Sequence, residues 1–169
     1  ENWASVDIVQ KLDYDKLLPL NATRYTLVEF AFDEEPWWIE AILKEMLSGG
    51  YIPIIAHPER YFCIHEAPNH LYEWRKMGAF AQMNKESILG RLGSHTAATA
   101  ELLLKHNLIN CLARDAHHSY VRTTDMTALN RYMENNFALG YRDLLMQTNP
   151  QAILEGQPLK LAGRFRRIE

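Results

Sequence analysis

The sequence of 169 residues lacks the features typical of secreted, membrane-spanning and nucleic-acid-binding proteins. Its two cysteines, Cys63 and Cys111, are too few for a disulfide framework and fit a reducing cytoplasm, so we interpret both as buried thiols. No apolar stretch approaches the roughly 18 to 20 residues of a membrane span. The net charge is −3, and the nearest approach to a basic run is the short segment 164–167, so no nucleic-acid partner is predicted.

The composition is that of a globular protein, with 47% hydrophobic and 23% charged residues. A chain of this length and composition can bury one sizeable core, so we expect a single domain, or part of one, across residues 1–169. The first residue is glutamate rather than methionine. We therefore expect a segment upstream of Glu1 to be missing from the sequence.

Four short runs of β-branched and aromatic residues have lengths suited to burial on both faces of a sheet. They predict strands at residues 25–32, 51–56, 79–83 and 108–113. Between the first two runs, apolar residues recur at helical spacing after Pro36, and this pattern ends at Gly49-Gly50. Three further helices are predicted within residues 71–77, 96–106 and 126–137.

Strands that alternate with helices of about 10 to 15 residues predict a parallel sheet, either open or closed into a barrel. Four strands with their helices are too few for an eight-stranded barrel, whose usual length is about 250 residues. We therefore expect an α/β protein in which part of a TIM-like (β/α) barrel is missing.

Polar residues with ligand chemistry stand at or just after the ends of all four predicted strands: Glu29, His57, Gln82 with Asn84, and Asp115 with His117. In parallel α/β folds, catalytic residues collect at the carboxyl ends of the strands. Each residue alone has a structural interpretation, since Glu29 suits a buried ion pair, His57 a hydrogen-bonded core histidine and Asp115 a turn. Their joint occurrence at the ends of successive strands favours a metal site.

Carboxylates and imidazoles without cysteine suit Mn²⁺, Fe or Zn²⁺ rather than a structural thiolate zinc centre. Asp115 and His117 alternate along an extended segment, so they suit neighbouring metals better than a shared one. A multinuclear hydrolytic site of this kind supports phosphoester chemistry. Arg60 and Arg122 follow His57 and His117 closely and are suited to gripping a phosphate, although each alone would also suit a surface ion pair.

Four motifs carry a resemblance to a known family. They are Pro53-Ile-Ile-Ala-His57-Pro-Glu-Arg60-Tyr61, Gln82-x-Asn84-x-x-Ser87-x-x-Gly90-x-x-Gly93, Ala113-Arg-Asp115-Ala-His117, and Asn149-Pro150 before Ile153-Leu154. Together they resemble the PHP-domain (polymerase and histidinol phosphatase) family, in its branch of protein-tyrosine phosphatases from bacterial capsule and exopolysaccharide operons. The resemblance covers essentially the whole chain. It implies a barrel of fewer than eight strands, of which residues 1–169 would form the C-terminal two-thirds.

The resemblance also implies metal ligands. Glu1 resembles a bridging carboxylate at the end of an upstream strand, and Glu1, Glu29 and His57 would together bind one metal. Asp115 would bind a second metal and His117 a third. The implied cofactors are divalent metal ions, Mn²⁺ first, with Fe and Zn²⁺ as alternatives.

Arg60 and Arg122 are implied to hold the substrate phosphate. The implied reaction is hydrolysis of phosphotyrosine by a metal-activated hydroxide, linked to capsule or exopolysaccharide biosynthesis. The implied partner is a phosphotyrosine protein in the cytoplasm, the Tyr-rich tail of a bacterial tyrosine kinase.

The sequence departs from the family pattern upstream and in one loop. The family has a His-x-His strand, a further acidic or histidine loop and another histidine before the glutamate that stands here at position 1, whereas no histidine precedes His57. The metals at Asp115 and His117 would thus lose most of their ligands. Arg114 stands where a small serine is usual, and Thr123-Thr124 follow Arg122 where the family tends to have proline.

Two alternatives to a tyrosine phosphatase stay open at this stage. One is a PHP phosphatase for a small substrate, such as histidinol phosphate or a sugar phosphate. The other is an inactive truncated fragment that serves as a binding module. A truncated barrel exposes sheet edges and helix faces, so we also expect a tendency to form homo-oligomers.

Overall fold

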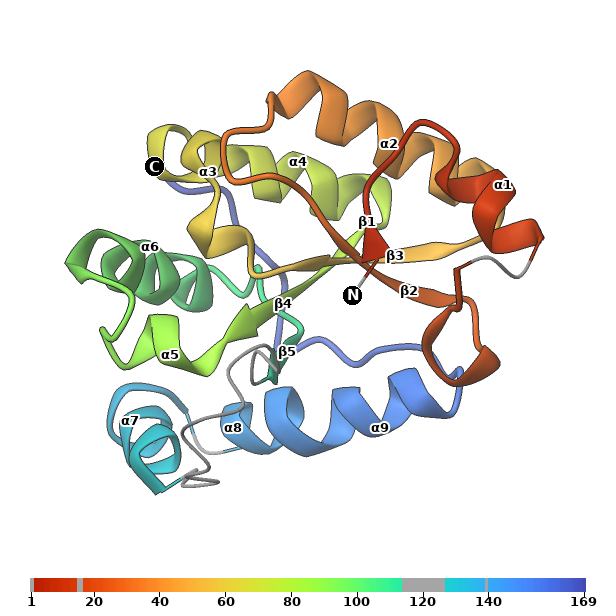
Figure 1. Ribbon diagram of the computed structural model, residues 1–169. Helices are drawn as coiled ribbons and strands as arrows, with labels where there is room; N and C mark the ends of the chain where they lie inside the picture. The colour runs from red at the N-terminus through yellow and green to blue at the C-terminus, as the bar shows by residue number, and fades with distance from the viewer. Residues whose placement is uncertain (1, 15–16, 114–126, 139) are drawn as a thin grey trace.

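A five-stranded parallel sheet forms the centre of the protein, as seen in a computed structural model that describes residues 2–14, 17–113, 127–138 and 140–169 (Figure 1). The strands are paired in the order in which they occur in the chain. They are β1 (Asn2–Trp3), β2 (Tyr25–Glu29), β3 (Ile52–Ala56), β4 (Phe80–Asn84) and β5 (Cys111–Ala113). The predicted α/β class with a parallel sheet is confirmed.

Helices connect the strands and follow the last of them. They are α1 (Ile8–Asp13), α2 (Pro36–Ser48), α3 (Phe62–Glu66), α4 (Asn69–Met77), α5 (Lys85–Ile88), α6 (Ser94–Lys105), α7 (Thr127–Asn136), α8 (Tyr141–Asp143) and α9 (Asn149–Leu154). Short 3₁₀ turns lie at η1 (Leu20–Ala22) and η2 (Pro58–Arg60), and a π-helical segment, η3 (Leu144–Thr148), precedes α9. As predicted, α2 begins at Pro36, whose missing N–H costs nothing in a first turn, and is followed by Gly49. Gly78 ends α4 with a positive φ of 112°, which suits glycine.

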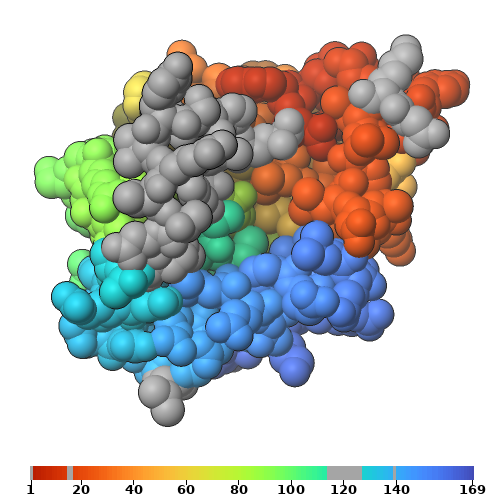
Figure 2. Space-filling model, turned by 60° about the horizontal axis from the view of Figure 1, so that its bottom comes forward, coloured from red at the N-terminus to blue at the C-terminus, as the bar shows by residue number. Residues whose placement is uncertain are grey.

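The sheet is apolar on both faces, which explains why its strands are nearly continuous hydrophobic runs. Val28, Ile55 and Met83 face the larger core, which includes apolar residues of α2, α4 and α6. Tyr25 and Ile54 face the opposite way and pack in a smaller cluster with Ile153 of α9. Figure 1 accordingly shows α2 and α4 on one side of the strands and α9 on the other, and Figure 2 shows the segment from α7 to α9 (cyan to blue) as a band along one side of the molecule.

β3 and β4 differ from the predicted strands by one residue at their ends, whereas β2 ends and β5 begins three residues inside the predicted limits, because polar groups interrupt the ladder. β2 ends at Glu29, and the N–H of Phe30 donates instead to the hydroxyl of Tyr61 at 3.2 Å. β5 begins at Cys111, because Asn110 pairs with Ala81 through both its side-chain oxygen and its backbone N–H, at 3.1 and 2.9 Å. Both differences leave the predicted strand cores in place.

The strand register brings the carboxyl ends of β2, β3 and β4 to the same end of the sheet, which we call its carboxyl edge. Val28 pairs with Ile55, and Ala56 pairs with Gln82. Glu29, His57 and Asn84 therefore lie near one another at the ends of three neighbouring strands, as the last residue of β2, the residue after β3 and the last residue of β4. At the same edge, Asn2 and Trp3 of β1 pair with the last two residues of β2.

Candidate metal centre

Glu29 and His57 meet at the carboxyl edge of the sheet. Oε1 of Glu29 lies 3.1 Å from Nε2 of His57, and the two side chains are 12% and 1% exposed. The sequence predicts both as ligands, and the structure brings them together. A carboxylate and an imidazole withdrawn from water in this way form either a hydrogen-bonded pair or two ligands of one cation.

The backbone of His57 has an unusual conformation. Its φ of 33° and ψ of 55° lie in the left-handed region, which is uncommon for a residue other than glycine. This turn ends β3 and starts η2, whose first bond runs from the N–H of Arg60 to the carbonyl of His57 at 3.0 Å. Strained backbone of this kind is concentrated at functional sites, where the surrounding structure maintains it.

Tyr61 stabilises the turn at His57 through two hydrogen bonds. Its hydroxyl donates to the carbonyl of Ala56 at 2.8 Å and accepts from the N–H of Phe30 at 3.2 Å, so one buried phenol joins the ends of β3 and β2. Burial raises the pKa of this phenol well above its ordinary value, so it stays neutral. The ring of Tyr61 also contacts the imidazole of His57, with centroids 6.0 Å apart.

Arg60 lies against an aromatic ring next to the pair. Its guanidinium carbon is 4.3 Å from the centroid of Phe32, which follows β2. Phe32 also contacts the ring of His57, with centroids 5.8 Å apart. The predicted phosphate-binding cation and the predicted metal ligand therefore share one aromatic neighbour.

Glu59 is a further buried acid of this region, in addition to the residues predicted from the sequence. Its Oε1 accepts from the N–H of Asn84 at 3.0 Å and from the hydroxyl of Ser87 at 2.7 Å, while its carbonyl accepts from Nε2 of His65 at 2.6 Å. Burial raises its pKa to about 7, against the lowering effect of the bonds from Ser87 and Asn84. Glu59 thus joins η2 to the end of β4 through hydrogen bonds. The sequence feature that could have identified Glu59 is its presence, together with Ser87, in the family motifs.

Asn84 has a structural role at the end of β4. Its side-chain oxygen accepts from the N–H of Glu86 at 3.0 Å and so caps α5, as asparagine commonly does at a helix start. Its backbone N–H is the donor to Glu59. The amide predicted at this strand end therefore supports the site by holding its neighbours in place.

Four predicted site residues lie outside the described residues: Glu1, Asp115, His117 and Arg122. β5 ends at Ala113, two positions before Asp115 in the sequence. Within the described ranges, no group of three or more His, Cys, Asp or Glu side chains is arranged to hold a metal ion. The described part of the site thus contributes the Glu29 and His57 pair together with Arg60.

Both cysteines are buried, as predicted. Burial raises the pKa of the Cys63 thiol to about 11 and that of the Cys111 thiol to about 12. Neither group has the depressed pKa of a reactive thiolate.

Known proteins resemble the chain over most of its length. A family model described as capsular polysaccharide synthesis, CpsB/CapC, matches residues 1–155. Over 153 residues the chain is 34% identical to the tyrosine-protein phosphatase YwqE of Bacillus subtilis, a match that covers 90% of this chain and 60% of that protein. Over 160 residues it is 26% identical to the tyrosine-protein phosphatase CpsB of Streptococcus agalactiae, covering 92% of this chain and 66% of that protein.

The fold matches as well. A chain among the crystal structures of YwqE from Bacillus subtilis and CpsB from Streptococcus pneumoniae, described as unique metal-dependent tyrosine phosphatases, superposes with a TM-score of 0.87 at 31% identity. That match covers 98% of this chain and 66% of the other. This chain therefore spans between 60% and 66% of these relatives.

Proposed function

Because the chain belongs to the CpsB/CapC family of capsular polysaccharide synthesis proteins, we propose that it is part of a metal-dependent protein-tyrosine phosphatase that acts in capsule or exopolysaccharide biosynthesis. The observation that carries the proposal is the contact between the buried His57 and the largely buried Glu29 at the carboxyl edge of the sheet, with Arg60 beside it. The reaction is hydrolysis of a phosphoric monoester of tyrosine. Because the chain spans only part of its relatives, the activity is proposed for the protein that its gene encodes.

The donor set fits a divalent metal ion. Glu29 Oε1 and His57 Nε2 lie 3.1 Å apart and are both withdrawn from water, so a carboxylate and an imidazole donor could face one ion here. Carboxylate and imidazole without thiolate suit Mn²⁺, Fe or Zn²⁺, and we propose Mn²⁺. When bound, such ions lower the pKa of water to near neutrality and polarise phosphoryl oxygens.

The remaining ligands of the proposal are Glu1, Asp115 and His117. β1 directly follows Glu1 in the chain and pairs with the end of β2 that carries Glu29, which supports the assignment of Glu1 to the same metal as Glu29 and His57. Asp115 and His117 follow β5 in the sequence and would serve a second and a third metal. We also propose that a His-x-His strand encoded upstream of Glu1 completes those two.

The residues of this chain have distinct tasks in the proposed reaction. Glu29 and His57 would hold one metal ion. Their withdrawal from water strengthens electrostatic interactions at the site. Arg60 binds the phosphate, because a planar guanidinium can donate two parallel hydrogen bonds to phosphate oxygens. We assign the same task to Arg122.

We further propose that the sheet is one part of a PHP (β/α) barrel. Five parallel strands paired in chain order, with helices between them, are what a barrel wall requires, and both faces of the sheet are apolar. A protein containing additional strands would continue this wall. In the absence of those strands, the exposed edges favour association between copies.

The proposed substrate is a phosphotyrosine protein, and the Tyr-rich tail of a bacterial tyrosine kinase is the specific partner that the resemblance suggests. We place the reaction in the cytoplasm. In the ranges that the structure describes, none of the helices has the length and apolar character needed to cross a membrane.

The test is turnover of an aryl phosphate and of phosphotyrosine and phosphoserine peptides by the gene-encoded protein with added Mn²⁺. We expect hydrolysis that depends on Mn²⁺, prefers the phosphotyrosine peptide and is abolished by His57→Ala or Arg60→Ala. Unchanged turnover in either variant would contradict the assignment. Higher kcat/KM on a small alkyl phosphate than on the phosphotyrosine peptide would instead indicate a small-substrate phosphatase.

A further inference from the structure

Phe32 contacts both a proposed metal ligand and the proposed phosphate-binding cation, and it has no role in the site so far. We propose that Phe32 is a positioning residue that holds the guanidinium of Arg60 at the metal edge before the phosphate arrives. The inference rests on the proposed function, because it takes Arg60 as a group that binds the phosphate.

The contact between Phe32 and Arg60 is a face-on cation–π contact. The guanidinium carbon lies 4.3 Å from the ring centroid, well inside the roughly 6 Å within which such contacts are attractive. Arginine stacks on aromatic faces while its N–H groups stay in the guanidinium plane and remain directed outward. With its guanidinium over the ring, Arg60 can therefore still donate to phosphate oxygens.

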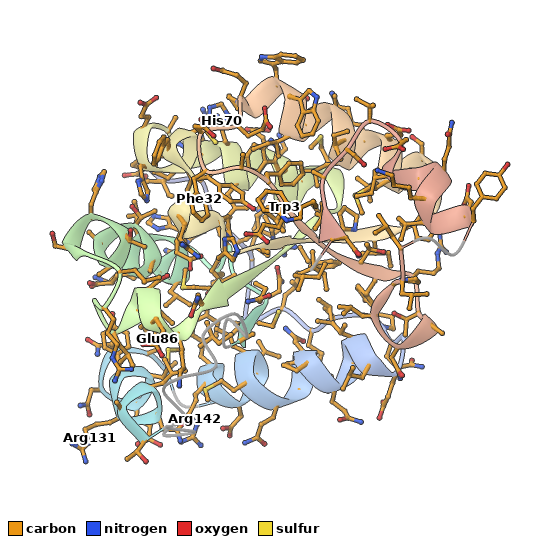
Figure 3. The ribbon with its side chains drawn as sticks, viewed as in Figure 1. Trp3, Phe32, His70, Glu86, Arg131 and Arg142 are labelled. Atoms are coloured by element: carbon orange, nitrogen blue, oxygen red, sulfur yellow. The ribbon has the colours of Figure 1, made fainter. Side chains whose placement is uncertain are left out.

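The ring of Phe32 is itself held in place from several directions. Its carbonyl accepts from the N–H of Phe62, the first residue of α3, at 2.8 Å, and Figure 3 accordingly places Phe32 beside α3. Its ring contacts His57 at a centroid distance of 5.8 Å and Tyr61 at 6.4 Å. Tyr61 is fixed in turn by its hydrogen bond to Ala56. Phe32 is thus a rigid platform set by the ends of β2 and β3.

Such a platform has a physical use at this position. The side chain of arginine is long and has many rotamers, and restricting it during substrate binding would weaken binding. A ring that restricts Arg60 beforehand removes that cost. Because the same ring contacts His57, the position of the guanidinium is tied to that of the metal ligand.

Phe32 is also partly buried against the core, so a purely structural role must be separated from positioning. Phe32→Leu keeps an apolar side chain but removes the aromatic face, whereas Phe32→Tyr keeps the face. If Phe32 only fills space, the two variants differ in stability but not in the position of the Arg60 guanidinium. If Phe32 positions Arg60, the guanidinium keeps its position in Phe32→Tyr and loses it in Phe32→Leu.

The first measurement needs no turnover. The Nε–H signal of Arg60, identified by its loss in Arg60→Lys, is recorded by nuclear magnetic resonance in the gene-encoded protein. We expect a ring-current shift in the wild type and in Phe32→Tyr that is lost in Phe32→Leu, with the melting temperature of each variant measured alongside. If Phe32→Leu does not fold, Phe32→Met replaces it. An Arg60 signal that is the same with and without the ring overturns the inference.

The second measurement is kinetic. We expect Phe32→Leu to lower kcat/KM for an aryl phosphate about 2- to 30-fold, mainly through KM, with Mn²⁺ affinity unchanged and with Phe32→Tyr retaining most of the activity. In an Arg60→Ala background, where turnover is expected to be abolished, Phe32→Leu should have no further effect on binding of inorganic phosphate. If Phe32→Leu weakens phosphate binding equally in the wild-type and Arg60→Ala backgrounds, the inference is overturned and the phosphatase assignment stays intact. Absence of any Mn²⁺-dependent turnover in the wild type contradicts the proposed function instead, and the Arg60 signal then decides the role of Phe32 alone.

Discussion

His57 Nε2 lies 3.1 Å from Glu29 Oε1, although the whole of α2 separates the two residues in the chain. Their proximity follows from the pairing of β2 with β3, which places the ends of the two strands next to each other. Adjacent strands thus bring the two proposed metal ligands into contact.

Removing the imidazole should weaken metal binding by this chain. We expect His57→Ala to lower the affinity for Mn²⁺ at least about 10- to 100-fold, since even loss of a supporting group around a metal has effects of that size. Titration of Mn²⁺ followed by electron paramagnetic resonance measures the change. His70→Ala is the matched control, because His70 lies on α4 and stacks on Trp74, and its Mn²⁺ titration should match the wild type. Equal loss in both variants would argue against a specific site.

The buried acid Glu59 should make stability depend on pH. Burial raises its pKa from 4.5 to about 7, so its contribution to stability is fully present below about pH 4.5 and is lost as the pH rises through about 7. Glu59→Gln keeps a neutral acceptor for Ser87 and Asn84. As the pH rises across this range, the free energy of unfolding of Glu59→Gln should therefore increase relative to that of the wild type, by up to about 3 kcal/mol at pH 8. Urea unfolding in the presence of a chelator, from pH 5 to pH 8, measures the difference.

The matched control for Glu59 is Glu40→Gln, which alters an exposed pair with Lys44. Its stability relative to the wild type should change little over the same range. A constant difference between Glu59→Gln and the wild type from pH 5 to pH 8 would show that the acid is ionised when folded.

Asn149 should be important for attaching the C-terminal segment to the sheet. Its buried amide nitrogen donates to the carbonyls of Asn110 and Lys160 at 2.8 and 3.0 Å, and its oxygen accepts from the N–H of Lys160 at 3.0 Å. Asn149→Asp removes both donors and places a charge next to two carbonyls, so we expect a loss of about 2–4 kcal/mol in the free energy of unfolding. Asn136→Asp, at an exposed position of α7, should cost under about 1 kcal/mol. Comparable losses in the two variants would contradict this role.

Both thiols should be inert in the folded protein. With pKa values raised by burial to about 11 and 12, Cys63 and Cys111 have very little thiolate at pH 8, and their burial also blocks reagents. We expect alkylation by iodoacetamide at pH 8 to be slow until a denaturant is added, after which both should be modified. Rapid modification of either thiol in the native protein, detected by mass spectrometry, would refute this expectation.

The parallel sheet was predictable because its strands are buried on both faces and are separated by helical spacing. The two-residue β1 was not, since no periodic pattern exists over Asn2 and Trp3 and the strand is defined only by its pairing with β2. The exact limits of β2 and β5 also depend on distant groups. The hydroxyl of Tyr61 and the side chain of Asn110 take hydrogen bonds that a local pattern would give to the ladder.

The site was predictable in the same partial way. The proximity of Glu29 and His57 could be predicted because both stand at the carboxyl ends of predicted parallel strands, whereas their role as metal ligands stays a prediction. Glu59 was overlooked, because a glutamate in a turn is usually solvated and its burial depends on Asn84 and Ser87, which come from another strand. The assignments of Glu1, Asp115, His117 and Arg122 stay predictions.

The pairing of β2 with β3 also determines where the chain can change in length. The distance between Glu29 and His57 is set by hydrogen bonds between strands, so residues added or removed in the turn from α2 to β3 would leave it unchanged. A one-residue slip of β3 would instead move every side chain of that strand to the opposite face of the sheet and carry His57 away from Glu29. Insertions should therefore be tolerated in the turn from α2 to β3 and excluded from β3.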